Sequence, residues 1–108
     1  MKGVFYADSL KFLLEEDKEL FEVIKELNEK VYTGKVLDYK TLKIIAIAIA
    51  AAKGDEKALK KQIVSGMKEL NITKDEVIDA LRVVLLTTGM PNFMKGMRVL
   101  KEVLEGKE

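Results

Sequence analysis

The stretch DYKTLKIIAIAIAAAKGDEKALKKQ, residues 38–62, decides the fold class of this chain. Asp38 is a good helix N-cap, because its carboxylate can accept a hydrogen bond from a free backbone N–H. Residues 44–52 are apolar without interruption, and Gly54 breaks the chain before Asp55 begins a second helix. Because a helix that is apolar on every side must be surrounded by protein, the stretch predicts a buried central helix followed by a second one.

The other helix boundaries are marked by capping residues, glycines and a proline. They are Asp8 or Ser9, Asp17, Gly34, Asn71, Thr73, Glu76, Gly89 and Pro91. Asp17 interrupts one apolar stripe, which predicts a short helix and then a longer one. Thr73 and Glu76 have the spacing of a capping box. The chain is therefore predicted to be all-α, a compact bundle of about five to six helices in a single domain, residues 1–108.

The opening stretch resembles the core of the carboxymuconolactone decarboxylase and alkyl hydroperoxidase D-like family. Redox members of that family carry a Glu, a Cys eleven residues after it, a second Cys two residues further on, and a His after three more residues, where each number counts the residues in between. In this chain the same positions hold Lys43, Asp55, Ala58 and Gln62. The likeness runs roughly from residue 20 to the C-terminus. Family members tend to have a polar pair before the apolar helix, glycines that break the chain between helices, and a Thr with acidic residues at the start of a later helix. In this chain these are Lys40, Thr41, Gly54, Thr73, Asp75, Glu76, Gly89 and Pro91.

The resemblance implies an all-helical, alkyl hydroperoxidase D-like domain that assembles as trimers or hexamers. It also implies a role in peroxide detoxification and oxidative stress, or in the decarboxylation of a small lactone acid. This chain contains no Cys and no His. Thiol-based peroxide reduction by this chain is therefore excluded on chemical grounds. The decarboxylase branch is expected to keep a His where Gln62 stands, and Gln62 cannot take up a proton, so whether the chain is an enzyme stays open. No cofactor or metal is expected, although a metal site built from carboxylates alone remains possible.

Lys43 is the residue with two competing interpretations. We expect it to be solvated, or to pair with Asp55 or Glu56. The alternative is a partly buried lysine with a lowered pKa, which acts as a base or Schiff-base amine or holds a small anionic ligand. The family positions would place this lysine near Asp55 and Gln62.

Two other groups of side chains are candidates for a binding surface. Met90, Phe93, Met94 and Met97 follow one helical stripe, and such a stripe indicates core or subunit interface rather than a ligand pocket. Tyr6, Tyr32 and Tyr39 are too scattered along the sequence to predict a stacking platform.

Composition narrows the classes of partner. The chain has 19 basic and 18 acidic residues, without the basic excess typical of a nucleic-acid-binding domain. Its longest apolar run is far shorter than the 20 or so residues of a membrane span, and the opening residues lack the apolar region of a signal peptide. We therefore expect a cytoplasmic protein. The scarcity of Gln and the abundance of Lys and Glu are typical of thermophile proteins.

Two helices, residues 38–53 and 73–88, lack a clean polar face. A single chain of this size covers two such helices poorly, which predicts a homo-oligomer. Two interpretations of the function remain: a divergent member of the family, and a non-catalytic oligomeric binding or scaffolding module. A nucleic-acid-binding helical domain is a third.

Overall fold

The computed structural model describes residues 8–106, and these form six α-helices and no strand. The helices are α1 (Asp8–Glu16), α2 (Lys18–Thr33), α3 (Tyr39–Ala52), α4 (Glu56–Leu70), α5 (Lys74–Thr88) and α6 (Met90–Leu104). The all-α prediction is confirmed. The expected opening tail and Tyr6 lie outside the described residues.

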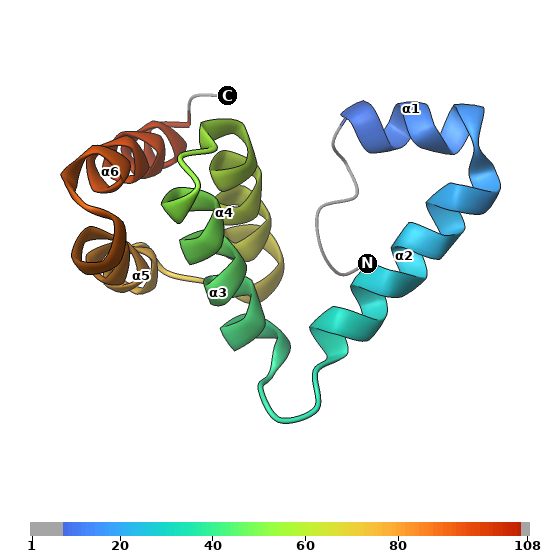
Figure 1. Cartoon of the computed structure of the whole chain (residues 1–108), viewed down its shortest axis with the longest axis horizontal. Helices are drawn as coiled ribbons and strands as arrows, with labels where there is room; N and C mark the ends of the chain where they lie inside the picture. Colours follow the sequence, from blue (N-terminus) through green and yellow to red (C-terminus); the bar gives the residue numbers. More distant parts are fainter. Residues whose placement is uncertain (1–7, 107–108) are drawn as a thin grey trace.

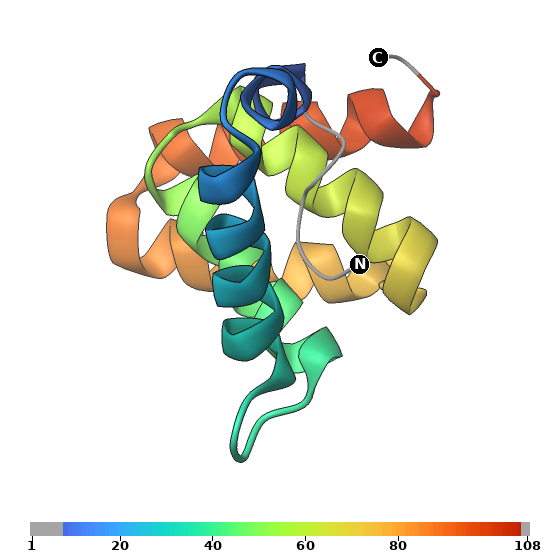
Figure 2. The same ribbon diagram turned by 90° about the vertical axis from the view of Figure 1, so that its right-hand side faces the viewer.

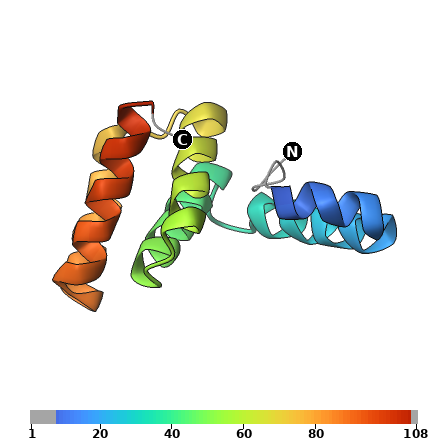
Figure 3. The same cartoon turned by 90° about the horizontal axis from the view of Figure 1, so that it is seen from above.

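The helices form a four-helix body and a two-helix arm (Figure 1). In the body, α3 packs against α4 and α5, and α6 closes the bundle by packing against α4 and α5. The arm consists of α1 and α2 and extends away from the body, as the view from above shows (Figure 3). Figures 1 and 3 show that α2 diverges from the body and meets it only toward the loop that leads into α3, and in Figure 2 α2 lies in front of the body in the line of view. That loop, residues 34–38, joins the arm to the body.

The predicted caps are present at these helix starts. Asp17, Asp38 and Asp55 each accept a hydrogen bond from the backbone N–H three residues later, at 3.1, 2.9 and 3.0 Å. Thr73 and Glu76 form the predicted capping box at the start of α5. Short-range side-chain chemistry therefore sets where these four helices begin.

The core of the body lies where α3 to α6 meet. Its most deeply buried side chains are Ile47, Leu59, Ile63, Val77, Leu81, Val84, Val99 and Leu100. Gly96 lets α6 approach α5 closely, because a Cβ there would lie only 2.6 Å from Cδ2 of Leu81. Asn92 donates a hydrogen bond of 2.8 Å to the Ala52 carbonyl, which ties the start of α6 to the end of α3.

The single chain does not enclose its two most apolar helices. Ile45 and Ile49 leave one face of α3 exposed, and Val83 and Leu86 do the same on α5. This exposure agrees with the expectation that a single chain covers two such helices poorly, because four helices around one core leave one side of α3 without a neighbour. The homo-oligomer itself stays a prediction. None of the described helices is both long enough and apolar enough to cross a membrane.

Candidate functional site

The candidate site centres on Lys43, in the second turn of α3. Its side chain is 0% exposed, and within residues 8–106 its Nζ has no hydrogen-bond partner. The expectation that Lys43 is solvated is therefore wrong. The expected ion pairs with Asp55 or Glu56 are also absent from the described part of the chain, where Glu56 instead pairs with Arg98.

Tyr32 covers the Lys43 amine from the arm. It lies in the last turn of α2, and Nζ of Lys43 is 5.7 Å from the centre of its ring, within the range of a cation–π contact. The Tyr32 ring also contacts the Tyr39 ring, with the ring centres 5.3 Å apart. Tyr39 donates a hydrogen bond of 2.9 Å to Glu69 on α4. Tyr32 and Tyr39 meet in a tilted contact, although they are seven positions apart in the sequence, because the loop at residues 34–38 turns the chain back between them.

Gln62 forms the α4 side of the site. Its Oε1 is buried and, like Lys43 Nζ, has no hydrogen-bond partner among the described residues, while its side chain makes a hydrogen bond with Tyr32. One turn later, Gly66 lies beside the aliphatic stem of Lys43, where an added Cβ would make an ordinary contact of 3.5 Å with Cγ of Lys43. The close approach that this glycine permits is to Ile72, whose Cδ1 would lie 2.8 Å from such a Cβ. Two buried polar atoms without partners therefore lie in the layer between α2, α3 and α4.

Burial changes the titration of both side chains that meet here. Loss of hydration lowers the pKa of Lys43 from 10.5 to about 8, and the negative charge of Glu69 opposes that shift. Burial also raises the pKa of the Tyr32 phenol, against a smaller opposite effect of its hydrogen bond with Gln62. The amine is thus close to losing its proton near neutral pH, while the phenol keeps its own.

Of the four family positions, the structure brings only Lys43 and Gln62 together around Tyr32. Asp55 lies beyond the far end of α3, whose axis rises roughly 14 Å between Lys43 and Ala52. Asp55 is exposed and serves as the N-cap of α4. Ala58 lies about one turn before Gln62 and packs against the core.

Sequence reasoning missed Tyr32, Tyr39 and Glu69 as parts of the site. The only sequence signal was the pair of tyrosines on either side of the Gly34 break. Glu69 carries no local signal, because it reaches the site through the packing of α4 against α3.

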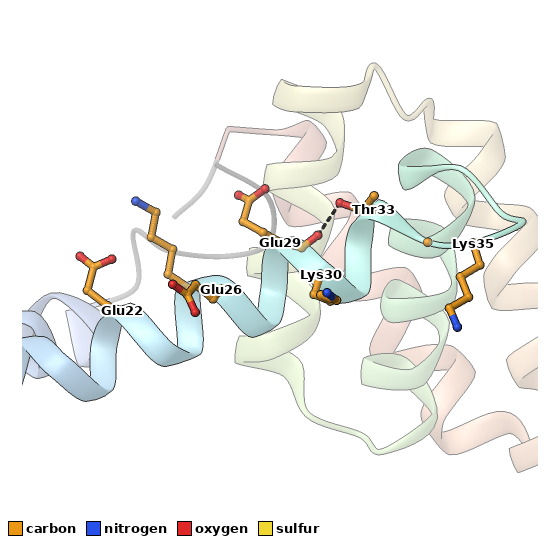
Figure 4. A pocket seen from close by; sticks show the side chains of 8 residues that line it. Glu22, Glu26, Glu29, Lys30, Thr33 and Lys35 are labelled. Atoms are coloured by element: carbon orange, nitrogen blue, oxygen red, sulfur yellow. Dashed lines mark hydrogen bonds between the residues drawn. The ribbon is translucent and has the colours of Figure 1, made fainter.

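An open groove elsewhere on the molecule follows α2 (Figure 4). It is lined by Glu22, Lys25, Glu26, Glu29, Lys30, Thr33, Gly34 and Lys35. Figure 4 shows the labelled charged side chains spread along the helix rather than converging on one point. The groove does not include Lys43 or Gln62, and its mixed charges are typical of a solvated helix face.

The methionine stripe on α6 divides between core and surface. Phe93 and Met97 pack against the core, whereas Met90 and Met94 are exposed. This arrangement agrees with the predicted core or interface role of the stripe. Within residues 8–106, no group of three or more acidic side chains lies close enough together to hold a metal ion.

The side chains of the Lys43 site offer three kinds of polar contact. The Lys43 ammonium can donate to an anion, the Gln62 carbonyl can accept a hydrogen bond, and the Tyr32 phenol can donate one. When the amine is neutral, its lone pair is also available as a base or nucleophile.

Known proteins match most of the length of this chain. The model of the carboxymuconolactone decarboxylase family matches residues 18–102, which include the arm helix α2 and all of the site. The chain is 52% identical over 100 residues to the uncharacterized protein MJ0742 of Methanocaldococcus jannaschii, covering 93% of this chain and 96% of that protein. It is 33% identical over 97 residues to the uncharacterized protein MJ1511 of the same organism, covering 90% of each. The chain belongs to the carboxymuconolactone decarboxylase family.

Proposed function

We propose that this chain is a divergent carboxymuconolactone decarboxylase family domain that binds a small organic acid at Lys43, without thiol redox chemistry of its own. The observation that carries the proposal is the buried Lys43 amine without a hydrogen-bond partner, next to a buried Gln62 oxygen in the same state. Burying an ammonium group without a partner costs free energy. A bound carboxylate would supply the missing acceptor.

The chemistry of the family positions supports an acid as the ligand class. Redox members carry a Glu where this chain carries Lys43, so the charge at this position is reversed. A positive group between α2, α3 and α4 favours an anion over a cation. Of the residues at the family positions Lys43, Ala58 and Gln62, Lys43 is the one whose side chain can exchange a proton near neutral pH, because Ala58 and Gln62 have no titrating group. A proton transfer to or from a bound acid would therefore depend on Lys43.

Thermal unfolding with small acids tests the proposal. Lactone acids and short dicarboxylates should raise the melting temperature of the wild type, and their neutral amides should not. Lys43→Met should abolish the shift, because it keeps the apolar stem and removes the charge. Lys61→Met is the matched control, since Lys61 is an exposed lysine beside Gln62 on α4. An equal shift in Lys43→Met, or no shift in the wild type, would overturn the proposal.

The exposed apolar faces favour a second candidate function, an oligomeric binding or scaffolding module. The arm exposes Phe12, Val23 and Leu27, and the body exposes Ile49 and Leu86. Isolated surface hydrophobics are ordinary, but runs of them on neighbouring turns of one helix are typical of interfaces. In this reading the ordered assembly is the product, and small acids leave the melting temperature of every variant unchanged.

A further inference from the structure

We propose that Lys43 captures small aldehydes or ketones as a covalent imine, with Gln62 and Tyr32 around the reacting nitrogen. This inference rests on the proposed function, because it uses the same site and assigns it a carbonyl-containing ligand. Three observations lead to it: the state of the amine, the groups that surround it and the way the site is covered.

The amine is available for attack on a carbonyl carbon. Lys43 Nζ has no hydrogen-bond acceptor among the described residues, so no neighbouring oxygen holds its protons in place. With a pKa of about 8, roughly a tenth of the Lys43 side chains carry a neutral amine at pH 7. For a lysine with the usual pKa, the neutral fraction at pH 7 is below about one in a thousand. Desolvated lysines of this kind are the ones that form Schiff bases with carbonyl compounds.

The neighbours of Nζ match the steps of imine formation. Attack forms a C–N bond while the carbonyl electron pair moves to oxygen, and a proton passes from nitrogen to that oxygen to give a carbinolamine. The C–O bond then breaks, water leaves and a C=N bond forms, so no oxidant or reductant is needed. The protonated Tyr32 phenol can donate a proton to the leaving oxygen and regain one from the iminium N–H, so that the nitrogen loses both protons to the water that leaves. Gln62 Oε1 has no hydrogen-bond partner among the described residues and can accept the N–H of the carbinolamine or iminium.

The cover over the site explains how a small molecule reaches a buried amine. Tyr32 is half-buried and belongs to the arm, whereas Lys43 and Gln62 belong to the body. Because Tyr32 lies over Nζ, the proposed reaction requires the Tyr32 side chain to turn or α2 to move, and the loop at residues 34–38 is where the arm joins the body.

Reductive trapping with the full chain tests the inference. The protein is incubated with glyoxylate and cyanoborohydride at pH 7, and peptide mapping measures how fast each lysine gains the reduced adduct. We expect Lys43 to react about ten-fold faster or more than the exposed Lys61, because the neutral amine is far more abundant at Lys43. Labelling of Lys43 no faster than that of Lys61 would overturn the inference. The comparison is made within one wild-type sample, so it does not depend on the folding of a variant.

Two further arms separate this inference from the proposed function. Glycolate has the carboxylate of glyoxylate but no carbonyl group, so it reports on acid binding alone through the melting temperature. A shift with glycolate without fast trapping at Lys43 would sink the imine and leave acid binding intact. If glycolate caused no shift and Lys43 were not trapped faster than Lys61, both the imine inference and the proposed acid binding would be overturned. Tyr32→Phe keeps the ring over Nζ and removes the hydroxyl, and it should slow trapping at Lys43 by about ten-fold while leaving Lys61 unchanged; an unchanged rate at Lys43 would remove Tyr32 from the reaction.

Discussion

The body and the arm of this molecule use similar amphipathic sequences in opposite ways. The body, α3 to α6, buries its apolar residues against one another around Ile47 and Leu81. The arm, α1 and α2, has only Phe21 buried among its described residues, although α2 carries a long apolar stripe. The difference shows that helix formation and helix burial are separate: caps and periodicity make a helix, whereas burial needs a neighbour.

The comparison also explains where the Lys43 site lies. The site forms where the C-terminal end of the arm meets the body, with Tyr32 from one region and Lys43 and Gln62 from the other. Chemistry placed at this junction depends on the packed body for position and on the arm for access.

The largest expected effect concerns the arm. We expect the wild type to have a mass that is a multiple of the 12.2 kDa chain, because association would cover the α2 stripe. Val23→Asp combined with Leu27→Asp should reduce the mass to that of one chain in light scattering. Glu22→Gln combined with Glu26→Gln, also exposed on α2, is the matched control and should leave the mass unchanged. A wild-type mass of one chain would contradict the expectation.

The next effect separates the two regions by stability. Leu81→Ala should lower the free energy of unfolding by about 2–5 kcal/mol, because it leaves a cavity in the body. Leu27→Ala on the arm makes the same chemical change at a residue that is 59% exposed, and at low protein concentration it should cost less than about 1 kcal/mol. Urea unfolding measures both. Similar costs would mean that the arm is packed as tightly as the body.

A smaller effect concerns the junction. In the unfolded chain Lys43 has its ordinary pKa of 10.5, whereas in the folded chain its pKa is about 8. Between these values the unfolded state binds more protons, so wild-type stability should rise with pH. Lys43→Met should therefore be more stable than the wild type by about 1–3 kcal/mol at pH 7, with the gap closing toward pH 10. Urea unfolding across that range measures the gap, and a constant gap would show that Lys43 titrates normally.

The smallest effect compares two asparagines. Asn92→Ala should cost about 1 kcal/mol, because its amide joins α6 to the end of α3 and the Ala52 carbonyl would lose its partner. Asn28 also donates to a carbonyl, that of Ile24, but within α2 itself. Asn28→Ala should cost only a few tenths of a kcal/mol, since Ala favours the helix. Urea unfolding measures both losses of unfolding free energy. Equal losses would argue against a special contribution of the hydrogen bond between Asn92 and Ala52 to the stability of the body.

Much of the fold was predictable, because its boundaries depend on short-range chemistry. Asp17 illustrates this, since one carboxylate at the right spacing separates α1 from α2. The spacing of the family motif also identified Lys43 and Gln62 as candidate residues. The burial of Lys43 was not predictable, because it depends on contacts between helices distant in sequence. Tyr32 covers it from α2, and α4 packs against α3 on its other side. Those contacts turn a lysine expected in solvent into the centre of the site.

The order of the two regions along the chain has a consequence for synthesis. The arm leaves the ribosome before any part of the body, yet the body contains most of the residues that can bury one another. We expect α2 to wait with its apolar stripe open until later helices, and then another chain, have been completed. Hydrogen exchange should accordingly label α2 well before α5. We therefore expect the arm, which is made first, to be protected last, and its exposure to last longest when copies of the protein are few.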